Sequence, residues 1–189
     1  SAGEPGARVA SWCAKGEIAC LLPLAAARAG MVHVPINPVL KRAQAAHILA
    51  DSGAAMLIGG KARLGSLESG DVADGCIVQE ETAVMEQALV QGNALPPSSF
   101  SPDALAAILY TSGSTGNPKG VMLSHANLWL GAVSVAHYLG LGSDDRVLAV
   151  LPFAFDYGQN QLLSTWRTGG CVVPLDYLLP RDVMRAVEA

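Results

Sequence analysis

Residues 105–120 read Leu-Ala-Ala-Ile-Leu-Tyr-Thr-Ser-Gly-Ser-Thr-Gly-Asn-Pro-Lys-Gly, and this stretch decides the fold class. Its first part, Leu105–Thr111, is a continuous apolar run of the kind found in strands that are buried on both faces. Such strands occur in parallel sheets that helices cover on both sides. The residues from Thr111 to Gly120 supply four hydroxyl side chains and three glycines, together with Lys119. The stretch therefore predicts a buried strand followed directly by a polar, glycine-rich loop.

The loop from Thr111 to Gly120 has the composition of an anion site. Glycines let the backbone approach a ligand closely, and successive backbone N–H groups in such a turn form a concave array that suits phosphate oxygens. The hydroxyls add donors, Lys119 adds a positive charge, and Pro118 stiffens the exit. The loop lacks the Walker A order, because its lysine follows Pro118 and precedes a glycine. A flexible surface hairpin is the alternative, although such Ser/Gly-rich segments seldom follow a buried strand directly.

Outward from this stretch, strand and helix patterns alternate along the chain. The pattern predicts strands at 8–13, 31–35, 55–58, 76–78, 120–123, 146–151 and 171–173, and helices at about 18–29, 41–52, 82–90, 124–139, 158–168 and from 180 onward. Gly30 and Gly53 stand where the first two helices should end, whereas Pro23 conflicts with a straight first helix. Repeated βα alternation predicts an α/β fold with mainly parallel sheets covered by helices.

One segment reads as a linker. Residues 93–102 (Asn-Ala-Leu-Pro-Pro-Ser-Ser-Phe-Ser-Pro) are rich in proline and serine. We therefore predict an N-terminal α/β subdomain over 1–92, a linker over 93–102, and an α/β segment over 103–189 that carries the loop.

Composition and charge exclude several functions. The chain has 189 residues and a net charge of −4, and its longest run of basic residues is the pair Lys41–Arg42, so we expect no nucleic-acid partner. The most apolar stretch, Ile18–Ala27, is shorter than the ~20 residues that a membrane span needs. The four cysteines lack metal-ligand spacing and read as reduced, mostly buried thiols. No metal site is expected, and the protein should be cytoplasmic.

The string from Tyr110 to Gly120 resembles the signature of the adenylate-forming (AMP-binding) superfamily, which includes acyl-CoA synthetases and the adenylation domains of nonribosomal peptide synthetases. Further segments that resemble the N-terminal half of that family are Arg8–Ala10, Ala29–Gly30, Val34–Pro38, Leu49–Ala54 and Ser124–Leu128. The resemblance implies the N-terminal part of the adenylate-forming ligase fold and the use of ATP.

By the same resemblance, the loop would hold the β- and γ-phosphates of ATP. Hydroxyls would come from Thr111, Ser112, Ser114 and Thr115, close approach from Gly113 and Gly116, and a steadying charge from Lys119.

A second candidate site is the segment from Phe155 to Gly158, which resembles the family segment beside the acyl pocket. Many acyl-CoA ligases carry a histidine there. This chain has Phe155-Asp156, which is more similar to amino-acid-activating domains, where the aspartate pairs with the substrate's α-amino group. Phe155, Asp156 and Gly158 are therefore the substrate-pocket candidates. The alternative is that Asp156 only stabilises the start of a helix through its negative charge.

The resemblance predicts an AMP-forming ligase that activates a carboxylic acid with ATP and passes the acyl group to a thiol, first of all coenzyme A. The alternatives are an amino-acid-adenylating domain that loads a carrier protein, and a nucleotide-binding module without catalysis. The family's other motifs, including its catalytic lysine and its Mg²⁺-binding glutamate, have no recognisable counterpart and are expected beyond residue 189. We therefore expect an N-terminal fragment that is inactive alone.

Overall fold

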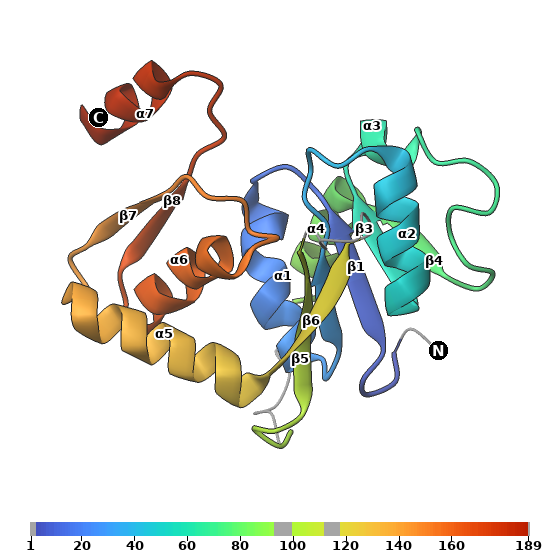
Figure 1. Ribbon diagram of the computed structural model, residues 1–189, viewed down its shortest axis with the longest axis horizontal. Coiled ribbons are helices and arrows are strands. Elements are labelled where there is room, and N and C mark those ends of the chain that lie inside the picture. Colours follow the sequence, from blue (N-terminus) through green and yellow to red (C-terminus); the bar gives the residue numbers. More distant parts are fainter. Residues whose placement is uncertain (1–2, 93–99, 112–117, 189) are drawn as a thin grey trace.

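The computed structural model describes residues 3–92, 100–111 and 118–188 (Figure 1). The strands are β1 (Arg8–Trp12), β2 (Val32–Pro35), β3 (Met56–Gly59), β4 (Ile77–Glu80), β5 (Leu105–Thr111), β6 (Lys119–Ser124), β7 (Arg146–Ala149) and β8 (Cys171–Pro174). The helices are α1 (Glu17–Arg28), α2 (Arg42–Ser52), α3 (Lys61–Leu64), α4 (Glu81–Gln91), α5 (His125–Leu139), α6 (Asp156–Arg167) and α7 (Pro180–Glu188).

Six strands form one sheet in the order β4-β3-β1-β2-β5-β6, and β7 pairs with β8 in a second, two-stranded sheet. Every pairing is parallel except that of β5 with β6, which form an antiparallel hairpin. The predicted α/β class with mainly parallel sheets is confirmed. Because β2 pairs with β5, the large sheet contains strands from both sides of residues 93–102. The division of the chain into subdomains there stays a prediction.

Alternating side chains of the large sheet face two different helix layers. Ala10, Val32, Val34, Leu57 and Ile108 pack with Ala45, Ile48 and Leu49 of α2 on one face. On the other face, Val9, Cys13 and Ile58 pack against α1, with α4 beside it. Burial on both faces explains why the central strands read as continuous apolar runs.

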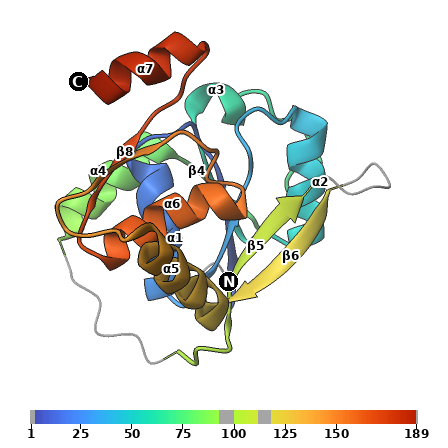
Figure 2. The same cartoon turned by 60° about the vertical axis from the view of Figure 1, so that its left-hand side comes forward.

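Helix α1 lies between the two sheets, as both ribbon views show (Figures 1 and 2). Ile18, Leu22 and Ala26 face the large sheet. Cys20, on another side of the helix, packs with Ala149 of β7, Phe153, and Leu162 of α6. Helix α1 is therefore apolar around much of its circumference because it is covered from two directions.

Pro23, which conflicts with a straight first helix, stands inside α1, and the helix continues to Arg28. The structure differs from the predicted bounds of some elements. Strand β7 ends at Ala149, two residues before the predicted end, and of its four residues Ala149 alone is fully buried. Of the four free cysteines, Cys13 and Cys20 are buried, whereas Cys171 is exposed. Within the described ranges, no helix has the length and apolar character needed to cross a membrane.

Candidate functional site

The two strands of the β5–β6 hairpin bring the ends of the glycine-rich loop together. In the antiparallel register, Thr111 lies opposite Lys119 and Tyr110 lies opposite Gly120. Thr111 and Lys119 are both exposed, whereas Tyr110 is only 7% exposed. The other predicted phosphate ligands, Ser112, Gly113, Ser114, Thr115 and Gly116, lie outside the described residues. The phosphate site thus stays a prediction, with its two flanking residues placed side by side.

Helix α2 contacts the chain on both sides of this loop. The hydroxyl of Tyr110 donates a hydrogen bond to Oδ2 of Asp51 at 2.6 Å. On the far side, Nε2 of His47 donates to the carbonyl oxygen of Pro118 at 3.2 Å. Burial, and secondly the bond to Asp51, raises the pKa of the Tyr110 phenol above its ordinary value, so the phenol remains a donor at neutral pH.

The three substrate-pocket candidates at the start of α6 lie in different surroundings. Phe155 is the N-cap residue of α6 and is partly exposed. It lines a cavity of about 150 Å³ together with Tyr110, Thr111 and Pro118, on the loop side of the molecule. Gly158 is buried, and a Cβ built on it would lie 1.9 Å from the carbonyl oxygen of Pro152. Gly158 is therefore required for close packing of α6 and lines none of these cavities.

Asp156 occupies the first turn of α6 and lines a second cavity, of about 190 Å³, between α5 and α6. Asn127, Gln159 and Asn160 supply further polar lining. Gln159 is 1% exposed, yet both polar atoms of its amide lack a hydrogen-bond partner, as does Oδ1 of Asn160. Buried polar groups without partners are rare in proteins, so this cavity can accept a ligand or water that forms hydrogen bonds. The two readings of Asp156 are compatible, because it stands at a helix start and also faces a cavity.

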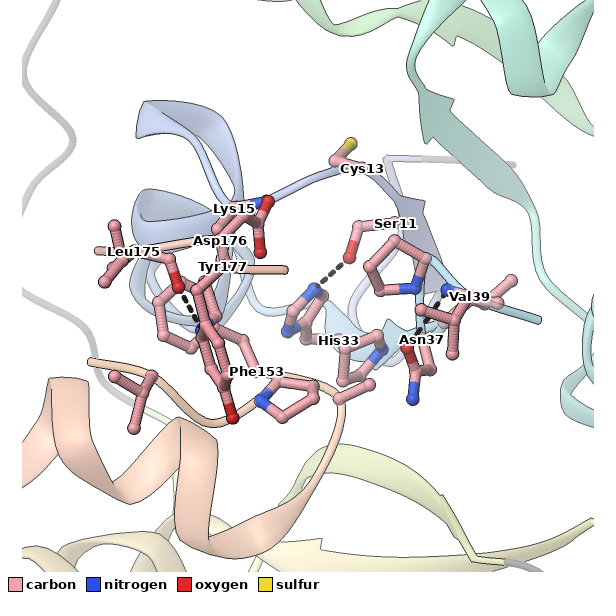
Figure 3. Close-up of a pocket in the computed structure, with 17 residues that line it drawn as sticks. Ser11, Cys13, Lys15, His33, Asn37, Val39, Phe153, Leu175, Asp176 and Tyr177 are labelled. Atoms are coloured by element: carbon pink, nitrogen blue, oxygen red, sulfur yellow. Dashed lines mark hydrogen bonds between the residues drawn. The ribbon is translucent and has the colours of Figure 1, made fainter. Parts of the chain in front are cut away.

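A third cavity, of about 310 Å³, lies where β1, β2, β7 and β8 end (Figure 3). This is the position outside the carboxyl ends of parallel strands where open α/β sheets bind ligands. Lys15 lines this cavity, and its Nζ donates to the carbonyl oxygens of Ala149 and Leu175, each at 2.9 Å. His33 is hydrogen-bonded through Nε2 to Oγ of Ser11 at 2.9 Å, while its Nδ1 has no partner.

Burial changes the protonation of the ionisable groups in this third cavity. Complete burial lowers the pKa of His33 to about 3, so the imidazole is neutral at physiological pH. Desolvation also lowers the pKa of Lys15, and the nearby carboxylate of Asp176 opposes that shift.

The Mg²⁺ that the sequence resemblance implies would require oxygen ligands, with carboxylates foremost. In the part of the chain that the structure describes, no group of three or more His, Cys, Asp or Glu side chains could hold a metal ion. The expectation that a glutamate beyond residue 189 binds Mg²⁺ stays a prediction.

Sequence reasoning missed the contacts of α2 beside the loop. Tyr110 and Asp51 stand in segments with a family resemblance and His47 does not, but no motif indicates that they bond, because 59 residues separate Asp51 from Tyr110 and 71 separate His47 from Pro118. The spacing of His47 and Asp51, four residues apart on one helix face, was the available signal. It indicates a shared face but not what that face contacts.

An α/β sheet with a polar, glycine-rich loop after a buried central strand defines a class of nucleotide- or phosphate-binding proteins. The model of the AMP-binding enzyme family matches residues 3–189. The chain belongs to this family.

Among curated proteins, the chain is 31% identical to the nonribosomal peptide synthetase valB of Aspergillus terreus over 166 residues, which is 85% of the chain and 6% of valB. It is 32% identical to the chondramide synthase cmdD of Chondromyces crocatus over 165 residues, 86% of the chain and 4% of cmdD. The chain thus spans a small part of the curated relatives that it matches.

Among solved structures, ATP-bound MatB from Rhodopseudomonas palustris aligns with a TM-score of 0.85 at 26% identity, over 98% of this chain and 38% of MatB. The complex of VinN with L-aspartate aligns with a TM-score of 0.78 at 27% identity, over 89% of this chain and 44% of VinN. The chain thus aligns with less than half of each of these larger structures.

Proposed function

We propose that the protein containing this chain uses ATP to activate a carboxylic acid that bears an amino group, forming an acyl adenylate. The acyl group then passes to the thiol of a carrier protein. The observation that carries the proposal is the β5–β6 hairpin, which brings Thr111 and Lys119 together at the ends of a hydroxyl- and glycine-rich loop. Membership of the AMP-binding family supports the same reaction class.

The proposed chemistry needs positioning and charge neutralisation more than a protein nucleophile. A carboxylate oxygen of the acid forms a bond to the α-phosphorus of ATP, the bond from that phosphorus to the bridging oxygen breaks, and pyrophosphate leaves. The loop flanked by Thr111 and Lys119 would hold the departing phosphates. In the second step, the thiol sulfur attacks the acyl carbon, and AMP leaves.

The amino group of the acid is inferred from the cavity between α5 and α6. Asp156 offers a carboxylate for a substrate ammonium, and Gln159 and Asn160 offer amide groups that lack partners within the protein. A fatty acid would leave these polar groups unpaired, which costs free energy. The VinN complex contains L-aspartate, an acid with an amino group, and this likeness favours the same substrate class here.

A carrier protein is preferred as acceptor because the curated relatives include the nonribosomal peptide synthetase valB and the chondramide synthase cmdD. Coenzyme A is the second candidate, since acyl-CoA synthetases share the loop signature of Tyr110–Gly120. The two acceptors are distinguished by supplying the complete protein with a carrier protein or with coenzyme A, and measuring which thiol becomes acylated.

The substrate proposal is tested by ATP–pyrophosphate exchange in the complete protein with a panel of amino acids and fatty acids. The best amino acid is then compared with its α-hydroxy analogue, which lacks the ammonium group. We expect the wild-type protein to prefer the amino acid at least about tenfold, because an ion pair to Asp156 adds to the hydrogen bonds. Asp156→Ala should reduce this preference to less than about threefold.

Asp144→Ala is the matched control, because Asp144 is exposed on a turn outside every cavity described here. It should leave the preference unchanged. An Asp156→Ala protein that retained the full preference would overturn the role of Asp156, and stronger exchange with fatty acids would overturn the substrate class.

A further inference from the structure

Two side chains on the polar face of α2 contact the residues that flank the segment 112–117 in the sequence. Asp51 accepts the hydrogen bond from Tyr110, the residue directly before Thr111, at 2.6 Å. His47 donates to the carbonyl oxygen of Pro118, the residue directly before Lys119, at 3.2 Å. Residues 112–117 run in sequence between these two attachment points.

Helix α2 is itself held firmly. Ala45, Ile48 and Leu49 are at most 3% exposed and pack on the large sheet. Gly53 ends the helix in the left-handed conformation, with φ of 59°, and its N–H donates to the carbonyl of Ala50. Because His47 and Asp51 are four residues apart, they project from one face of this fixed helix. Their hydrogen bonds therefore connect Tyr110 and Pro118 to a helix that is fixed on the hydrophobic core.

The Tyr110 ring is also confined by its cross-strand neighbour. A Cβ built on Gly120 would lie 3.2 Å from Cζ of Tyr110 and 2.7 Å from Cγ2 of Ile108. Because Gly120 has no side chain, the Tyr110 ring can occupy the space beside it. In this position the phenol hydroxyl donates its hydrogen bond to Asp51. A side chain at 120 would displace the ring and weaken that bond.

From these contacts, we propose that His47 and Asp51, here called the α2 pair, are positioning residues that fix both ends of the phosphate loop for ATP. The inference rests on the proposed function for its kinetic consequence. Neither side chain is expected to touch the substrate. Each acts through a residue that flanks the loop, so that Thr111 and Lys119 are held in place before ATP arrives, which lowers the cost of ordering them on binding.

The kinetic test uses exchange assays on the complete protein with His47→Ala and Asp51→Ala. Loss of one such hydrogen bond should lower kcat/KM for ATP about tenfold. The KM for the carboxylic acid should change less than about twofold, because the acid binds elsewhere. His47→Gln keeps an N–H donor and Asp51→Asn keeps an acceptor oxygen, so both should recover kcat/KM for ATP to within about threefold of the wild type.

His137→Ala and Asp144→Ala are matched controls, since both side chains are exposed and lie outside the residues assigned to the site. They should leave the kinetics unchanged. If the alanine variants of the α2 pair kept kcat/KM for ATP within twofold of the wild type, the proposal would be overturned. It would also be overturned if kcat/KM for ATP and for the acid fell in equal proportion together with Tm, because that is the result of a purely structural role.

Amide hydrogen exchange tests the role of the α2 pair independently of the proposed enzymatic function. Amides of residues 119–124 should exchange faster in His47→Ala than in the wild type or in His47→Gln, whether or not the protein catalyses exchange of pyrophosphate. Unchanged amide exchange in this strand would overturn the proposal even in a protein with full activity. A wild-type protein without pyrophosphate exchange would refute the proposed function and leave the hydrogen-exchange result as the test of the α2 pair.

Discussion

At the residue scale, the informative side chains are buried polar groups rather than surface charges. His33, 2% exposed, uses one ring nitrogen on Ser11 and leaves the other without a partner. Gln159 leaves its whole amide without a partner beside Asp156. Each such group costs free energy in the folded chain unless something in its cavity satisfies it. Both cavities therefore contain buried polar groups that lower the stability of the folded chain.

We predict that His33 stays neutral well below the pH at which an ordinary histidine gains its proton. Its pKa in the folded protein, about 3, lies below the ordinary histidine value of 6.5, so the unfolded chain binds more protons between these two values. Stability is then fully present above about pH 7 and is lost as pH falls toward 3, by about 2 kcal/mol at pH 5.

The measurement is an NMR titration of the imidazole resonances in the complete protein. The His33 resonances should remain constant from pH 8 to pH 5. A His33 titration midpoint between pH 5 and pH 8 would contradict the burial argument.

At the element scale, the start of α6 decides which side chains face which cavity. Phe155 caps the helix without a side-chain hydrogen bond, and Asp156 follows in the first turn, where its negative charge is favourable. Gly158 lets this turn approach the carbonyl of Pro152. The phase of the helix thus directs Phe155 toward the loop and Asp156 toward α5.

We predict that Gly158→Ala destabilises the protein by about 2–3 kcal/mol, because the new methyl group would overlap a backbone oxygen that cannot rotate away. The shift of α6 should also reduce the amino-acid preference that we assign to Asp156. Thermal unfolding of the complete protein measures the first effect. Gly142→Ala is the control, since the nearest atom to its added Cβ lies 3.9 Å away. Equal Tm values for the two variants would refute the packing argument.

The elements themselves were largely predictable from the sequence. Strand β5 was predicted with its observed bounds because its apolar run has the length of a strand and ends at a glycine-rich segment. Ser124 was predicted as an N-cap, and its hydroxyl accepts from the N–H of Asn127 at 3.2 Å. The start of α6 was predicted two residues late, at Gly158 instead of Asp156, because glycine in a first helical turn reads as a boundary.

At the scale of the whole molecule, the site depends on contacts between distant segments. The sequence identified Asp156 and the loop as separate motifs, but the order β1-β2-β5 that sets α2 beside the loop is a property of the sheet. No local pattern reports which strands become neighbours. For the same reason the cavity between the two sheets could not be predicted, since four different strand ends contribute to it.

We predict that Lys15 joins the two sheets. Its Nζ donates to the carbonyl oxygens of Ala149, the last residue of β7, and of Leu175, which follows β8. The same atom lies 5.5 Å from the centre of the Phe153 ring. Lys15→Met should remove two charge-assisted hydrogen bonds and cost about 2–3 kcal/mol. Thermal unfolding and hydrogen exchange of residues 146–149 measure the loss. Lys61→Met, at an exposed position, is the control. An unchanged Tm in Lys15→Met would contradict the prediction that Lys15 joins the two sheets.

The central claim is that this chain carries the phosphate loop of a ligase that forms an acyl adenylate. The most direct test is the incorporation of labelled pyrophosphate into ATP by the complete protein, with and without a carboxylic acid. We predict incorporation that depends on the acid, with AMP and pyrophosphate as products once a thiol acceptor is added. Absence of incorporation with every acid tested, in a folded protein that binds ATP, would contradict the claim, as would release of ADP in place of AMP.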